Sequence, residues 1–210
     1  MSQHAGANLW ESPEHAREYL NRVDSIPRRG EGEATVVEFI PENAKRILDL
    51  GTGAGRLLAL VKEARPHAHF VGLDFSQTML GEIRKRFASH PNVAVVEHNF
   101  EHALPLIGTF DAVISSFAIH HLRHERKRSL YGDIYEILNP GGRFYDLDLV
   151  SSPTAKLHAD FMKATHREKE DPENKLLDLQ TQLKWLLEIG FTDVDCHWKW
   201  REFALLGGVK

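Results

Sequence analysis

The sequence has little cysteine and no long apolar stretch. Its one cysteine, Cys196, cannot close an internal disulfide and leaves no thiolate cluster for structural zinc. The longest uninterrupted apolar run, 57–61, is far shorter than the roughly 20 residues that cross a bilayer, and residues 1–18 lack the basic and apolar regions of a signal peptide. From these absences we expect a cytoplasmic protein that does not bind a membrane.

An excess of positive charge is also missing. The chain carries 26 Lys and Arg against 30 Asp and Glu, a formal net charge of −4 at pH 7. No global field therefore draws it to nucleic acid or to an anionic membrane surface. The balance favours a small-molecule substrate and leaves the oligomeric state open.

What the sequence does contain is typical of one ordinary soluble domain, residues 1–210, because 42% of its residues are apolar and 27% charged. Short β-rich runs alternate with longer segments of helical pattern, which indicates βαβ units and a mainly parallel α/β sheet. The expected strands are 46–50, 69–74, 93–98, 110–116 and 141–150, followed by two close runs after 190 that should pair antiparallel. The expected helices are 56–64, 76–88, 127–138 and 180–188, with Ser76 as an N-cap and Asn139-Pro140-Gly141-Gly142 as a stop.

Two segments fall outside this alternation. Residues 12–40 carry helical patterns ahead of the first strand, and we expect an N-terminal helical cap there. Residues 151–179 are polar and charged and follow the end of a strand, where either a lid or a solvated connector is expected.

The strongest chemical signal is the run LDLGTGAG at 48–55, a strand that enters a glycine-rich turn before a helix. Glycines at 51, 53 and 55 let the backbone approach a ligand closely, and Asp49 places a carboxylate beside the turn. Asp74 closes the next strand, where an acidic residue commonly binds a ribose diol. Together these residues predict nucleoside binding.

The same turn argues against a dinucleotide. In the spacing G-x-G-x-x-G the third glycine would stand at position 56, which is Arg56 here, and Asp49 would repel a pyrophosphate. A carboxylate at that place suits a cationic amine, such as the one in the methionyl part of S-adenosylmethionine.

Five ordered motifs extend this signal: LDLGTGAG, GLDFS, EHNFEHALP, FDAVISSFAIHHL and LNPGGRF. In that order they resemble the motifs of the class I S-adenosylmethionine-dependent methyltransferases. The resemblance implies a Rossmann-like, mostly parallel seven-stranded sheet in the order 3-2-1-4-5-7-6, its last strand antiparallel, with helices on both faces. It does not specify the substrate.

The resemblance also implies roles for individual residues. The residues carried over to the cofactor site are Asp49, Gly51, Thr52, Gly53, Asp74, Phe75, Asn99, Phe100, Ser115 and, on the N-terminal helix, Tyr19. Asp74 would hold the ribose and Phe75 would flank the adenine. Asn99 departs from the family, which commonly has aspartate there, although an amide oxygen still accepts a hydrogen bond. The transferred methyl should lie near the end of the fourth strand, at 115–117, unless its serines only cap the strand.

Three histidines follow that strand, at 120, 121 and 124. A metal site is not predicted, because adjacent histidines rarely converge on one ion and the other ligands are not signalled. The stretch is similar to a loop of plant O-methyltransferases, and this similarity places His120 as a general base, a role that suits an imidazole. The alternative is that the histidines only pack the loop.

The sequence therefore predicts methyl transfer from S-adenosylmethionine to an oxygen, nitrogen or carbon atom of a small molecule, with S-adenosylhomocysteine as the product. Three alternatives stay open. The chain could bind the cofactor without turnover and act through a partner, it could transfer a modified methyl group, or it could be an NAD-dependent oxidoreductase.

Overall fold

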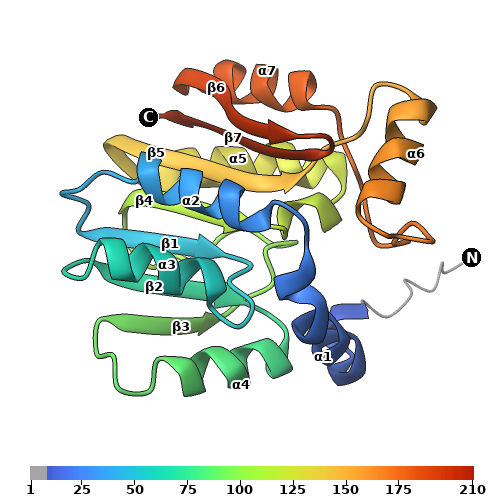
Figure 1. Cartoon of the computed structure of the whole chain (residues 1–210). Coiled ribbons are helices and arrows are strands. Elements are labelled where there is room, and N and C mark those ends of the chain that lie inside the picture. Colours follow the sequence, from blue (N-terminus) through green and yellow to red (C-terminus); the bar gives the residue numbers. More distant parts are fainter. Residues whose placement is uncertain (1–8) are drawn as a thin grey trace, which may run out of the picture.

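A computed structural model describes residues 9–210, which form a seven-stranded sheet in the order β3-β2-β1-β4-β5-β7-β6 (Figure 1). The strands are β1 Arg46–Leu50, β2 His69–Asp74, β3 Val93–Glu97, β4 Phe110–Ser116, β5 Leu138–Leu149, β6 Thr192–Trp200 and β7 Phe203–Val209. Strands β1 to β5 pair in parallel, and β7 lies antiparallel between β5 and β6. The order and the reversed last strand confirm the predicted fold class.

Helices cover both faces of this sheet (Figure 1). The helices are α1 Pro13–Arg22, α2 Arg29–Phe39, α3 Arg56–Ala64, α4 Gln77–Arg86, α5 His124–Ile137, α6 Ala155–Ala164 and α7 Leu179–Ile189, with short 3-10 turns η1 Leu9–Glu11, η2 Val23–Ser25 and η3 Ile119–His121. Alternate strand residues face opposite layers, so Ile47 packs with α2 and α3 while Leu48 and Leu50 pack with α5 and α7. The core is thus split into two layers by the sheet.

Two of the predicted element ends are built differently in the structure. Ser76 occupies the N-cap position of α4, but its side chain makes no capping bond. Its backbone amide donates instead to Asp74, so the carboxylate stabilises this helix start. The run Asn139 to Gly142 lies within β5, because α5 passes into the strand at Leu138 without an intervening loop.

The segments outside the alternation lie at the carboxyl end of the parallel strands (Figure 1). Of the predicted cap at 12–40, α1 lies at this end, whereas α2 packs on the sheet against β5, β6 and β7. The 151–179 segment contains α6 and then an irregular stretch, residues 165–178, which we call the 165–178 loop. These two segments enclose the space above the strand ends.

Candidate functional site

The glycine turn after β1 needs glycine for two different reasons. Gly51 has φ +65°, and a Cβ there would come 2.2 Å from the Cβ of Ala118, so no side chain fits. Gly53 also has positive φ, but a Cβ there would meet only the sulfur of Met79, at 3.9 Å. Gly53 therefore borders open space, and a ligand can approach its backbone closely.

Asp74 ties this turn to the neighbouring strand. Its Oδ2 accepts a hydrogen bond from the amide of Gly53 at 2.8 Å, and its Oδ1 accepts one from the amide of Ser76 at 2.9 Å. Burial raises the pKa of the Asp74 carboxyl, while these amide bonds act in the opposite direction. Because each oxygen keeps a second lone pair, the carboxylate can still accept bonds from a ligand diol.

Asp49 is almost fully buried at the end of β1. Its Oδ2 accepts a hydrogen bond from the Thr52 hydroxyl at 2.7 Å. The pKa of Asp49 is raised to about 7, chiefly by burial; the Thr52 hydrogen bond opposes this shift, and the charges of Asp74 and Glu33 contribute to it. A cationic ligand group would stabilise the ionised form of this carboxyl.

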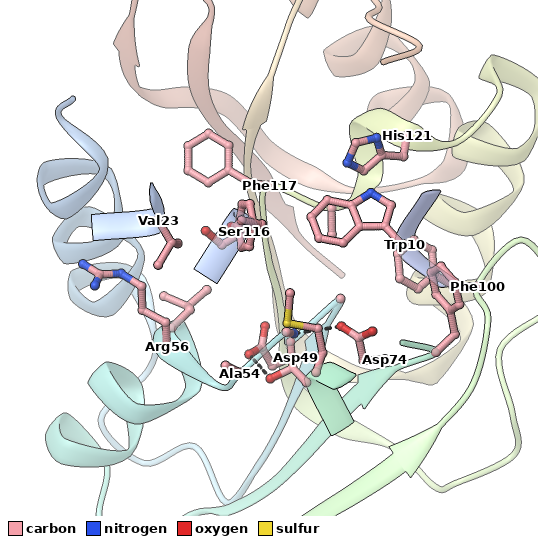
Figure 2. Close-up of a pocket in the computed structure, with 18 of the residues that line it drawn as sticks. Trp10, Val23, Asp49, Ala54, Arg56, Asp74, Phe100, Ser116, Phe117 and His121 are labelled. Atoms are coloured by element: carbon pink, nitrogen blue, oxygen red, sulfur yellow. Dashed lines mark hydrogen bonds between the residues drawn. The ribbon is translucent and has the colours of Figure 1, made fainter. Parts of the chain in front are cut away.

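The turn and these carboxylates border a cavity of about 740 Å³, which we call the first cavity (Figure 2). The predicted cofactor residues that line it are Tyr19, Asp49, Gly51, Thr52, Gly53, Asp74, Phe75, Asn99 and Phe100. In Figure 2 the carboxylates of Asp49 and Asp74 lie below the cavity, with Trp10 and His121 above them. Residues from the first three motifs, together with Tyr19 of α1, thus border one space.

The two serines at the end of β4 have different environments. Ser116 lines the first cavity, whereas Ser115 does not and donates its hydroxyl to the carbonyl of Leu50 at 3.0 Å. The difference follows from strand geometry, because consecutive side chains point to opposite faces. Ser115 is therefore a buried strand contact in this structure, in contrast to the cofactor role that the resemblance implies.

A buried ion-pair network at the cavity was missed by sequence reasoning. Glu33 of α2 is fully buried and accepts bonds from Arg29 at 2.7 Å and from Arg56 at 2.9 Å. Arg29 also donates to the Tyr19 hydroxyl at 2.7 Å and lines the first cavity. The i,i+4 spacing of Arg29 and Glu33 was the available signal. The network holds α2, α1 and the glycine turn together and places a guanidinium beside Ser116.

His120 lies outside the first cavity and lines a neighbouring one of about 620 Å³, the second cavity. Its Nδ1 lies 2.5 Å from Oδ1 of Asp148 on β5, and its backbone amide donates to Oδ2 of the same carboxylate at 2.7 Å. A carboxylate at Nδ1 favours the tautomer with the proton there, which leaves Nε2 with a lone pair. The pair thus has the arrangement that a general base needs.

Four residues border both cavities and so form a wall that the cavities share: Trp10, Tyr19, Phe117 and His121. The His121 ring lies 3.9 Å from the His120 ring and 5.5 Å from the Trp10 ring, centroid to centroid. Burial, and then the charge of His120, lower the pKa of His121 well below its ordinary value. His121 is therefore a neutral part of this shared wall.

Lys127 of α5 fixes the loop that carries His120. Its buried ammonium donates to the carbonyls of His120 and Lys175, and the Lys175 amide donates to the His120 carbonyl at 2.9 Å. The 3-10 turn η3 is thereby linked to the 165–178 loop. Backbone position at His120 thus depends on a segment that is distant in sequence.

Residues 9–210 contain neither a cluster of metal ligands nor a membrane-spanning helix. No group of three or more His, Cys, Asp and Glu side chains in this range is placed to hold a metal ion. Within the same range, no helix has the length and apolarity that a membrane span requires.

Comparison with known proteins gives three informative matches. Residues 47–142 match the family model of a methyltransferase domain. A demethylmenaquinone methyltransferase from Thermus thermophilus is 36% identical over 137 residues, 64% of this chain and 61% of the relative. A carboxy-S-adenosyl-L-methionine synthase from Helicobacter hepaticus is 26% identical over 212 aligned positions, 87% of this chain and 86% of the relative.

The fold agrees with these matches. The solved structure of an O-methyltransferase family protein from Burkholderia thailandensis superposes with a TM-score of 0.74 at 22% identity, covering 96% of this chain and 61% of that one. The chain spans about three fifths of the length of the Thermus relative. By its domain match, its ordered motifs and its sheet, the chain belongs to the class I S-adenosylmethionine-dependent methyltransferases.

Proposed function

We propose that the chain transfers a methyl group from S-adenosylmethionine to a small-molecule acceptor. One observation carries this proposal. The first cavity, with the buried carboxylates of Asp49 and Asp74, shares a wall of aromatic side chains with a second cavity, which is bordered by the histidine of a histidine–aspartate pair. One space suits a nucleoside with a cationic amine, and the other suits an acceptor whose proton must be removed.

The donor set of the first cavity fits this cofactor. Asp49 would hold the ammonium of the methionyl part, and Asp74 the ribose diol, while Phe75 and Phe100 would flank the adenine. The same set does not suit a dinucleotide, since the buried Asp49 would face a pyrophosphate. The charges in the first cavity therefore favour S-adenosylmethionine over NAD.

The chain would contribute mainly position and proton transfer. When bound, S-adenosylmethionine supplies an electrophilic methyl group. Phe117 borders both cavities and Ser116 borders the first, so they would hold the acceptor in line and exclude water. His120 would take the proton of an attacking hydroxyl at Nε2, with Asp148 holding its ring.

Calorimetry tests the cofactor assignment. S-adenosylhomocysteine should bind more tightly than NAD, and Asp74→Ala should weaken it by about 1.5–3 kcal/mol, the range for hydrogen bonds to a charged group. Glu97→Ala is the matched control, because Glu97 is exposed at the end of β3 and pairs in register with Asp74 outside the cavity. Equal or tighter binding of NAD would refute the assignment.

A second candidate reaction carboxylates the cofactor, with a separate carboxyl donor, instead of transferring its methyl group. It is favoured by the relative that this chain matches over 86% of its length, which is named as a synthase of carboxy-S-adenosyl-L-methionine. Mass spectrometry of the product distinguishes the two, because a transferred methyl adds CH2 to the acceptor. A protein that binds the cofactor without turnover would yield neither product in this measurement.

The setting in which the chain works stays a prediction from composition. We propose cytoplasmic activity on a small molecule, without nucleic acid, membrane or metal.

A further inference from the structure

The second cavity contains an arginine without an anionic partner. Arg167 borders this cavity and a smaller one beside it, and its side chain is partly buried. Within residues 9–210, its guanidinium makes no hydrogen bond and no carboxylate lies within 4.0 Å of it. Arg29 and Arg56, in the first cavity, are both paired with Glu33. A desolvated guanidinium that lacks a partner is costly, which makes Arg167 an exception in this protein.

The backbone holds Arg167 in place. Two residues beyond the end of α6, His166 has φ +54°, and the Arg167 amide donates to the carbonyl of Met162 at 2.9 Å, which closes the helix end. The guanidinium lies over the ring of Phe161, 5.6 Å from its centroid, and that ring is fully buried. Arg167 is therefore positioned by the core of the protein and not by an ion pair.

A second arginine without an ion pair borders the same cavity from the opposite segment. Arg22, in the last turn of α1, is exposed and makes no side-chain hydrogen bond or ion pair within the described residues. Burial lowers the pKa of Arg167, and among the charges around it the positive charge of Arg22 lowers it most. Of the charges that act on Arg167, the strongest is therefore the positive charge of Arg22.

Within residues 9–210, no acidic side chain around this cavity forms an ion pair with either arginine; the charges of Asp171 and Glu202 act on the pKa of Arg167 in the direction opposite to that of Arg22. Glu170 and Glu202 both bind His158, at 2.9 and 2.7 Å, and Asp171 accepts the backbone amide of Glu173. Glu18 and Glu168 are exposed and make no ion pair with either arginine within residues 9–210. Lys169 is exposed as well and adds positive charge at the opening.

We propose that the methyl acceptor carries an oxyanion group, a carboxylate or a phosphate, which Arg22 and Arg167 bind in the second cavity. The inference rests on the proposed function and names the substrate class of the same site. Two guanidinium groups suit such a group, because each offers parallel N–H donors to a pair of oxygens. His120 borders the same cavity, so an acceptor anchored at the arginines can extend toward the base. Phe117 and Phe203 supply apolar area for the rest of the molecule.

Matched probes test this directly. Calorimetry on the full chain loaded with S-adenosylhomocysteine would use pairs that differ only in charge: 4-hydroxybenzoate against 4-hydroxybenzamide, phenylacetate against phenylacetamide, and phenyl phosphate against phenol. We expect at least one anion to bind 10-fold or more tightly than its neutral partner. The carboxylate and phosphate arms distinguish the two sources of the oxyanion.

Variants assign the effect to the arginines. Arg167→Gln should weaken the anion by about 10–100-fold, and Arg167→Lys should restore only part of this, because lysine lacks the planar fork. Arg17→Gln is the matched control, since Arg17 is exposed on the same helix as Arg22 and borders neither cavity. Affinity for S-adenosylhomocysteine should be unchanged in all of these variants.

Three results would overturn the proposal: equal affinity for anion and neutral partner, no binding of any anion in the panel, or an equal loss in Arg17→Gln and Arg167→Gln. The titrations are repeated without S-adenosylhomocysteine. These titrations compare each anion with its neutral partner whether or not the cofactor assignment holds, so they decide whether the arginines bind an oxyanion. Failure of the cofactor assignment would appear separately, as a lack of S-adenosylhomocysteine binding.

Discussion

The two cavities are built in different ways. The first is held by hydrogen bonds between the backbone and side chains fixed on the sheet, such as the bonds of Asp74 to the amides of Gly53 and Ser76. The second is enclosed by α1 and the 165–178 loop, which side chains such as Lys127 and His158 connect to the rest of the protein. The first cavity is therefore fixed by the sheet itself, while the second depends on contacts that single substitutions can remove.

The largest effect expected from this comparison is in the second cavity, at His120. If Nε2 of His120 removes the acceptor proton, His120→Ala should lower turnover by about 10²–10⁴-fold while affinity for S-adenosylhomocysteine is nearly unchanged. Asp148→Asn should also lower kcat more than it changes KM, because the ring loses the carboxylate that holds it. Steady-state kinetics on an identified acceptor measure both.

The control for this prediction is His124→Ala. His124 lies at the start of α5 on the same loop, is exposed, and contacts only the carbonyl of Leu176 through its ring. A comparable loss in this variant would indicate damage to the loop. Near-normal turnover in His120→Ala would exclude the base role and favour an acceptor that is already nucleophilic.

In the first cavity, the expected effect is a pH dependence of binding. The pKa of Asp49 is raised to about 7, chiefly by burial, so below pH 7 the empty site holds a proton there. A ligand ammonium favours the ionised carboxylate, and affinity for S-adenosylhomocysteine should therefore fall as pH falls below about 7, by at most about 10-fold per pH unit. Calorimetry between pH 5.5 and 8 measures this.

Adenosine is the matched control ligand, because it lacks the amine and should show a flatter profile. Asp49→Asn should bind S-adenosylhomocysteine more weakly and remove the dependence. A profile that is the same for both ligands would mean that the amine is held elsewhere.

The sequence predicted the strands and the helix around the first cavity well because their signals are local. The strands at 46–50, 69–74 and 110–116 and the helix at 56–64 agree with the structure to the residue. The glycine turn and the carboxylates at strand ends are set by a few neighbouring residues, and parallel strands bring those ends together. Nine of the ten residues assigned to the cofactor border one cavity.

The acceptor side could not be predicted in this way, since its contacts join segments distant in sequence. The bond between His120 and Asp148, and the contact of Lys127 with the 165–178 loop, depend on how loops pack over the sheet. The sequence also does not show which of Ser115 and Ser116 reaches the first cavity. That depends on which face of the sheet each side chain points to. Arg167 gave no sequence signal, as its charged surroundings resemble a solvated face.

The smallest expected effect concerns the attachment of the 165–178 loop. His158 of α6 connects Glu170 of the loop, 74% exposed, to Glu202, which is 1% exposed. The pKa of His158 is raised, first by its hydrogen bond to Glu202. Since the folded pKa lies above the ordinary value of about 6.5, the stabilisation is complete below that value and is lost as pH rises through the raised pKa. Above it, the loop should open more often.

Trypsin cleavage after Arg167 and Lys169 measures that opening, with each rate divided by the rate on an unfolded substrate at the same pH. We expect the normalised rate to rise by about 2–5-fold as the imidazole loses its proton, because exposed ion pairs contribute less than about 1 kcal/mol. His158→Gln should give the fast rate at every pH, while His67→Gln, exposed ahead of β2 and remote from the loop, should keep the wild-type profile. If cleavage in the wild type is independent of pH, or if His67→Gln behaves like His158→Gln, the loop is held by its contacts with Lys127 and not by His158.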